Sequence, residues 1–204
     1  MDLIESLKKQ ERLREDYWKN VDYFLPIRLK WRAQMVRHFF HLFPENSILE
    51  VGAGSCQWTR EISESNGNCN PICAAIFNKG LYEENNPFPE NIERIHLDEF
   101  PGKLSERRFD FIVAYQLLTD ENAGVLLSEL KKLLKPGGQI LFFDPNPWNP
   151  YYKIRRLASK LLFFFKRAEK SESLNRVDLF TLLSEAGYIK IKILPYDFLF
   201  PPLP

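Results

Sequence analysis

The feature that most constrains this chain is an apolar run that ends in two glycines, Ile48-Leu49-Glu50-Val51-Gly52-Ala53-Gly54. The run predicts a strand that turns sharply under a ligand, because glycine adopts positive φ and lets the backbone approach closely. The helix expected next would point free N–H groups at that ligand. A dinucleotide-binding loop needs a third glycine three residues after the second. Gln57 stands there, so the sequence argues against an NAD-dependent enzyme.

Length and composition indicate one ordinary soluble domain. The chain has 204 residues, of which 45% are hydrophobic and 27% charged, within the usual range for globular proteins. A net charge of +1 gives no global field that would attract nucleic acid. The first residues lack the pattern of a signal peptide, and no stretch of about 18 apolar residues could span a membrane. We therefore expect a cytoplasmic protein without a metal site.

The rest of the chain alternates between strand and helix patterns. We expect helices over residues 1–25 (a solvated helix, stopped before Pro26), 28–43, 55–65, 122–134 and 176–186, and strands over residues 47–52, 71–77, 92–97, 109–114, 139–144 and 188–194. This alternation predicts an α/β fold with a Rossmann-like, open and mainly parallel sheet and helices on both faces. Residues 1–46 would form an N-terminal helical cap, and residues 47–204 the α/β domain.

Three motifs in this order resemble those of the class I S-adenosylmethionine-dependent methyltransferases. They are Glu50-Val51-Gly52-Ala53-Gly54, Phe109-Asp110-Phe111-Ile112-Val113, and Leu133-Leu134-Lys135-Pro136-Gly137-Gly138 before a strand. The resemblance is to the small-molecule branch, and it implies S-adenosylmethionine as cofactor and a small or lipid-linked acceptor. Strand 109–114 continues into Tyr115-Gln116, not the (Asn/Asp)-Pro-Pro-Tyr of enzymes that methylate amide or nucleobase nitrogen.

The resemblance also implies which residues bind the cofactor. They are Glu50, Gly52, Ala53, Gly54, Phe77, Asn78, Asp98, Glu99 and Ala114. One position departs from the family pattern, because the strand ending in Phe77-Asn78 lacks the acid that normally accepts both ribose hydroxyls. Hydrogen bonds to a charged acceptor contribute about 1.5–3 kcal/mol each, so we expect weaker cofactor binding than is usual.

The candidate catalytic residues are Asp144, Tyr115 and Gln116. Tyr115 and Gln116 end a central strand and should lie near the sulfonium, and Asp144 is the carboxylate best placed to accept a proton. None of the three histidines is expected there. Transfer from a sulfonium depends mainly on holding the acceptor at near-attack distance, which can contribute about 7–11 kcal/mol.

Two features near the C-terminus leave alternatives open. Residues 150–170 form a basic and apolar insertion, with six Lys or Arg between residues 151 and 168. This insertion is either a lid on an anionic membrane surface or a helix packed over the active site. The family's last, antiparallel strand is missing from the sequence pattern, which suggests a fragment. A non-catalytic, membrane-associated binding module is therefore the alternative to an enzyme.

Overall fold

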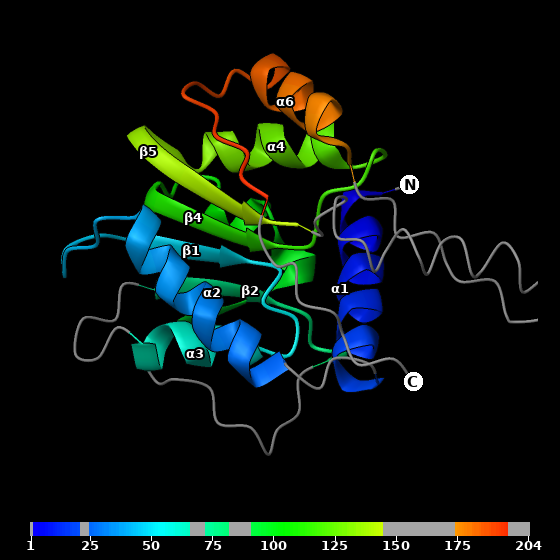
Figure 1. Ribbon diagram of the computed structural model, residues 1–204, viewed down its shortest axis with the longest axis vertical. Coiled ribbons are helices and arrows are strands. Elements are labelled where there is room, and N and C mark those ends of the chain that lie inside the picture. Colours follow the sequence, from blue (N-terminus) through cyan, green and yellow to red (C-terminus); the bar gives the residue numbers. More distant parts are fainter. Residues whose placement is uncertain (1, 21–24, 66–71, 82–90, 145–173, 196–204) are drawn as a thin grey trace, which may run out of the picture.

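The computed structural model describes residues 2–20, 25–65, 72–81, 91–144 and 174–195, and its centre is a five-stranded sheet (Figure 1). The strands are β1 (Ile48–Val51), β2 (Ile72–Phe77), β3 (Glu93–His96), β4 (Phe109–Tyr115) and β5 (Leu134–Phe143). Their spatial order is β3-β2-β1-β4-β5, and every neighbouring pair is parallel. The predicted open parallel sheet is confirmed. The strand order reverses between β1 and β4, which is where ligands bind in sheets of this kind.

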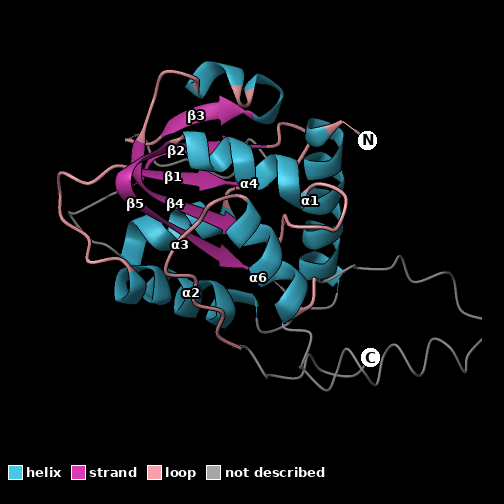
Figure 2. Ribbon diagram, turned by 90° about the horizontal axis from the view of Figure 1, so that it is seen from above, coloured by secondary structure: helices cyan, strands magenta, loops and turns pink. Residues whose placement is uncertain are grey.

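Helices cover both faces of the sheet, as the sequence predicts (Figures 1 and 2). Helices α2 (Leu25–Phe39) and α3 (Gln57–Ser65) pack on one face, and α4 (Ala123–Lys132) and α6 (Arg176–Glu185) pack on the other. The α4 stripe of Leu126, Leu127 and Leu130 is completely buried, since residues three and four apart share a helix face. Strand β4 contributes Ile112 to one core and Val113 to the other, as expected of a central parallel strand.

Helix α1 (Leu3–Asn20) crosses the carboxyl ends of the strands instead of covering a face (Figure 2). Leu7 joins the core beside α4, and Trp18 joins the core beside α2 and α3. The predicted helix is confirmed from Leu3 to Asn20, but the prediction that it is solvated is wrong. The prediction took the charged residues of this helix as exposed, whereas several of them are buried against backbone groups at the edge of the sheet.

Three predicted boundaries are also wrong for local reasons. Helix α2 begins at Leu25 and includes Pro26, because proline is tolerated in the first turn, where its missing N–H has no helical partner. The same helix ends at Phe39, so Phe43 is not part of the predicted stripe and is 57% exposed. Strand β5 begins at Leu134, before the glycines that were expected to separate helix from strand.

The predicted strand over residues 188–194 is wrong as well. Residues 188–195 adopt no strand conformation, and a cavity separates them from β5. A strand needs a hydrogen-bonded partner, and the cavity lies between these residues and β5, where the family's last strand would stand. The described residues contain no antiparallel strand. The basic insertion at 150–170 lies outside the described residues, and both readings of it stay predictions.

Candidate active site

The β1–α3 loop is built around two glycines that no other residue could replace without displacement. Gly52 and Gly54 have φ of +77° and +56°, values that side-chain-bearing residues rarely adopt. A Cβ on Gly52 would lie 2.6 Å from Leu117 Cδ1, and one on Gly54 would lie 2.3 Å from Arg14 Nη2. Ala53 is buried, and its N–H donates to Ile76 O at 2.9 Å. The loop is thus fixed to β2, at the point where the strand order reverses.

Glu50 is a buried carboxylate directly below this loop. It is 1% exposed, and burial raises its pKa to about 7, although the Thr59 hydroxyl and the Arg14 charge partly oppose that rise. Its neighbour in β4 is Val113, and the next pair along is Val51 with Ala114, which is also buried. Glu50 and Ala114 therefore lie beneath the loop, inside the sheet.

Three charged side chains of α1 bind the loop from above. Arg14 Nη1 donates to Gly52 O at 2.7 Å and to Tyr115 O at 2.9 Å. Glu11 Oε1 accepts from Gly54 N at 3.3 Å. Glu15 Oε1 accepts from Ser55 N at 3.2 Å, and Glu15 Oε2 accepts from Ser55 Oγ at 2.8 Å. We call Glu11, Arg14 and Glu15 the α1 triad; their exposed fractions are 0%, 4% and 1%.

The electrostatics of the α1 triad are those of a tight internal cluster. Arg14 Nη2 lies 3.2 Å from Glu15 Oε1, so one cation stands between two carboxylates. Burial raises the pKa of Glu11 to about 7, while Arg14, the Asn78 amide and the Gly54 N–H oppose the rise. Because buried charges are retained only with compensating partners, the triad depends on the backbone groups that it binds.

Aromatic rings surround the carboxyl end of β4. The Tyr115 ring is 1% exposed and lies 5.2 Å from Trp18, 5.5 Å from Trp58 and 6.3 Å from Phe143, centroid to centroid. The Arg32 guanidinium lies 4.4 Å from the Tyr115 centroid, and that of Arg14 lies 5.5 Å from it. Cations are attracted to aromatic faces at these distances, so this ring cluster is suited to a positively charged group.

The residues expected to bind the nucleoside lie at the ends of β2 and β3. Phe77 and Asn78 are each 5% exposed. Asn78 Oδ1 accepts from Gly80 N at 3.1 Å, which leaves one lone pair of this amide oxygen for a ribose hydroxyl. Asp98 is paired with Lys8 of α1 at 2.6 Å, and Glu99 accepts from His96 N and Lys103 Nζ.

Gln116 and Asp144 lie at the ends of neighbouring strands. Gln116 has a φ of +49°, and its N–H donates to Phe143 O at 2.8 Å. Asp144 follows Phe143 directly. Burial raises the pKa of Asp144 to about 7, and a hydrogen bond from the Leu118 N–H partly opposes the rise. The structure therefore brings Tyr115, Gln116 and Asp144 to one edge of the sheet, as expected from their strands. Asp98 and Glu99 lie further along it, beyond β2.

The α1 triad was not among the predicted site residues. A signal for it was present in the sequence. Leu7, Glu11, Arg14 and Trp18 recur every three or four residues and so share one helix face. A charged residue within a stripe that also carries Leu and Trp indicates a buried, partnered charge. Among the described residues, no group of three or more His, Cys, Asp and Glu side chains is arranged to hold a metal ion.

Comparisons with known proteins agree on one family. Residues 13–192 match the family model described as a methyltransferase domain. A demethylmenaquinone methyltransferase of Staphylococcus haemolyticus is 26% identical over 183 residues, covering 80% of this chain and 76% of that protein. Its counterpart in Staphylococcus aureus is 24% identical over 185 residues, with the same coverage.

Solved structures share the fold at low sequence identity. The CurJ carbon methyltransferase has a TM-score of 0.61 and 19% identity, and the match covers 97% of this chain but only 57% of CurJ. The plantazolicin methyltransferase BpumL, solved with a desmethyl substrate analogue and SAH, has a TM-score of 0.57 and 17% identity, covering 89% of this chain and 76% of BpumL. Human N-acetylserotonin methyltransferase, solved with SAM, has a TM-score of 0.56 and 20% identity, covering 94% of this chain and 52% of the human protein.

Proposed function

The chain belongs to the methyltransferase domain family and is a class I S-adenosylmethionine-dependent methyltransferase, and we propose that its acceptor is a small molecule with a long apolar tail, such as a lipid-linked quinol. Two lines of evidence support this acceptor class. The first is the similarity to demethylmenaquinone methyltransferases. The second, which carries the proposal, is a large apolar cavity that reaches Asp144.

The β1–α3 loop fits the amino-acid end of S-adenosylmethionine. That end presents an ammonium donor and a carboxylate acceptor. The loop region offers carbonyl oxygens at Gly52 and Tyr115, and N–H donors at Gly54 and Ser55, each shown to be usable by its bond to α1. The absence of a Cβ on Gly52 and Gly54 permits close approach. S-adenosylmethionine supplies an activated methyl group on a sulfonium, and the Tyr115 ring cluster lies beside the loop at the carboxyl end of β4.

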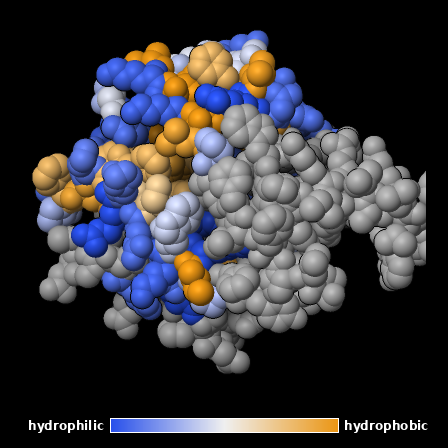
Figure 3. Space-filling view, viewed as in Figure 1, coloured by the Kyte–Doolittle hydropathy of each residue, from blue (hydrophilic) through white to orange (hydrophobic). Residues whose placement is uncertain are grey.

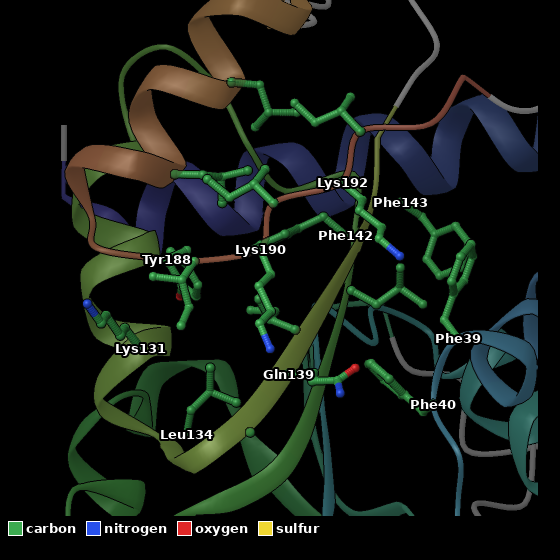
Figure 4. A pocket seen from close by; sticks show the side chains of 18 of the residues that line it. Phe39, Phe40, Lys131, Leu134, Gln139, Phe142, Phe143, Tyr188, Lys190 and Lys192 are labelled. Atoms are coloured by element: carbon green, nitrogen blue, oxygen red, sulfur yellow. The ribbon is translucent and has the colours of Figure 1, made fainter.

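The cavity lies between β5 and residues 187–195 and has a volume of about 1340 Å³. Figure 4 shows Phe39 and Phe40 on one side of β5, and Leu134 and Tyr188 on the other. The lining also includes Ile140, Phe142 and Leu194. In the space-filling view a band of apolar side chains lies beside β5, bordered by hydrophilic ones (Figure 3). Apolar clefts with few polar groups are the usual form of small-molecule sites, and this one is large enough for several prenyl units.

The inner end of the cavity supplies the catalytic geometry that we propose. Phe143, Asp144 and Leu118 line it, and Tyr115 and Phe143 are in ring contact. An acceptor tail in the cavity would place its head group beside Asp144. A carboxylate with a pKa of about 7 can accept a proton near neutral pH, while Tyr115 and Gln116 position the head group against the methyl donor.

Lysines at the cavity set its charge. Lys131, Lys135, Lys190 and Lys192 line it, and Figure 4 shows Lys190 and Lys192 extending from residues 187–195. No helix in the described ranges is long and apolar enough to span a bilayer. Attachment to an anionic membrane surface through residues 151–168 stays a prediction.

The test is methyl transfer from labelled S-adenosylmethionine to demethylmenaquinol and to the same ring without its prenyl tail. We expect kcat/KM to be at least tenfold higher for the tailed acceptor. Burying the tail contributes about 0.8 kcal/mol for each CH₂ group removed from water. Phe142→Asp, which places a charge in the cavity, should remove most of this preference. Val125→Asp, at an exposed position on α4, is the matched control. Equal rates for both acceptors, unchanged in a folded Phe142→Asp variant, would contradict the proposal.

A further inference from the structure

The α1 triad occupies the polar groups that the cofactor requires. Its cation binds two carbonyl oxygens, on Gly52 and Tyr115, and its carboxylates bind two backbone N–H groups, on Gly54 and Ser55. A bound amino acid would present the same pattern, with an ammonium on the carbonyls and a carboxylate on the N–H groups. Each of the two N–H groups has one hydrogen to donate, and the Arg14 guanidinium stands where an ammonium would approach the two carbonyl oxygens.

The space above the loop is filled by the same side chains. A single Cβ added to Gly54 would meet Arg14 Nη2 at 2.3 Å and Glu15 Oε1 at 2.5 Å. The Arg14 guanidinium also lies 4.8 Å from the Trp18 ring centroid and 5.5 Å from that of Tyr115. It therefore stands among the rings suited to a sulfonium. Helix α1 therefore presents the charge pattern of a ligand's amino-acid end and occupies the space directly above Gly54.

Outside the triad, the described contacts of α1 lie near its two ends. Leu7 is buried beside α4, and Trp18 is buried beside α2 and α3. Ser6 Oγ accepts from Asn122 Nδ2 at 2.9 Å, and Lys8 pairs with the exposed Asp98. The middle of the helix is held by the triad, whose surroundings raise the pKa of Glu11. Local opening requires few buried apolar contacts, and α1 meets that condition better than the sheet does.

We propose that α1 is a built-in competitor of S-adenosylmethionine: Glu11, Arg14 and Glu15 occupy the β1–α3 loop as an internal mimic of the cofactor's amino-acid end, and the cofactor binds only when they withdraw. This inference rests on the proposed placement of the cofactor over Gly52–Gly54. Since apparent affinity falls with the fraction of molecules in the competent state, docking of α1 sets the cofactor affinity of the whole enzyme.

The first test measures α1 directly in the unaltered protein. Hydrogen exchange of the α1 amides is compared with and without saturating S-adenosylhomocysteine. We expect faster exchange over residues 4–18 in the complex, because α1 must leave the loop. Slower exchange would overturn the proposal, since it would mean that α1 closes over the ligand and that the triad belongs to the binding site.

The second test changes the anchors of α1 and leaves the loop intact. Leu7→Ser removes a buried apolar contact. Lys8→Glu replaces an ion pair with two carboxylates. Because this second change lies at the surface, the Lys8→Glu variant should fold even if Leu7→Ser does not. Calorimetry with S-adenosylhomocysteine should show binding about tenfold tighter for Leu7→Ser, if the open state rises from about a tenth of the population, and a smaller tightening for Lys8→Glu. Ile27→Ser, at an exposed position on α2, is the control and should change nothing.

The outcomes separate this inference from the proposed function. In one outcome the native chain binds S-adenosylhomocysteine, and the affinity is unchanged or lower in both variants. That result overturns the competitor role but leaves the methyltransferase assignment standing. Binding only after α1 is loosened supports the competitor role strongly. Failure of every form to bind S-adenosylhomocysteine overturns both the competitor role and the cofactor placement.

Discussion

Glu50 offers the sharpest prediction about the energetics of the site. Its pKa in the folded protein is raised from 4.5 to about 7, chiefly by burial. A carboxyl group whose folded pKa is raised binds its proton more tightly in the folded state. Its ionisation therefore costs stability as the pH rises from 4.5 to 7, and the cost stays constant above that range. Replacing Glu50 with Gln removes the ionisation and keeps nearly the same shape.

The expected difference in unfolding free energy follows from the pKa shift of Glu50. A shift from 4.5 to about 7 corresponds to about 3 kcal/mol, at about 1.4 kcal/mol per pH unit. We expect the free energy of unfolding of Glu50→Gln to exceed that of the native chain by about 2–3 kcal/mol at about pH 8, with little difference at about pH 4.5. The assay is urea unfolding followed by circular dichroism at both pH values.

The matched control is Glu121→Gln, at an exposed position just before α4, which should change the stability little at either pH. The reasoning would be refuted if Glu50→Gln were destabilised equally at both pH values. That result would mean that the Glu50 carboxylate makes hydrogen bonds that outweigh the cost of burying its charge.

Two further predictions concern the frame that holds the site. Asp110 Oδ2 accepts from Ser47 N, Ser47 Oγ and Lys135 Nζ, each at 2.8 Å; burial alone would raise its pKa, but these partners hold it at about 2. Asp110→Asn should therefore lose about 1–2 kcal/mol of stability near pH 7, after allowing for solvent screening. In urea unfolding the deficit should disappear as the pH falls from about 4 to about 2; a deficit independent of pH would rule out the ion pair as its source. Asn175 caps α6 by accepting from Val177 N and Asp178 N. Asn175→Ala should lower the free energy of unfolding by about 1 kcal/mol and speed hydrogen exchange at these two amides. Unchanged exchange would count against the cap.

Much of the fold could be predicted because its central strands and the turn after β1 have clear local patterns. The run from Ile48 to Gly54 predicted the position of the β1–α3 loop, and the apolar strand 109–114 predicted the neighbouring central strand. The stripe of Leu126 and Leu130 predicted a helix on one face. These signals are local, since each depends on residues within one element.

The errors arose where partners distant in sequence decide the outcome. Helix α1 looked solvated because Arg14 and Glu15 are charged, yet their partners lie on the loop some forty residues away. Residues 188–194 had the pattern of a strand, but within the described part of the chain no strand pairs with them. The oxygen of Asn78 is bound to Gly80, a turn contact that composition does not reveal. A charged side chain can be expected at the surface only when the fold offers it no buried backbone group as a hydrogen-bond partner.

The central claim is that the cofactor binds over the β1–α3 loop, and it is tested most directly by calorimetry with S-adenosylhomocysteine on the native chain and on Gly54→Val. Gly54 has positive φ and no room for a Cβ, whereas Gly124 on α4 has open space around it, so Gly124→Val is the matched control. The account predicts one binding site in the native chain, retained in Gly124→Val and lost in Gly54→Val, with all three folded by circular dichroism. Undiminished affinity in a folded Gly54→Val variant would contradict it.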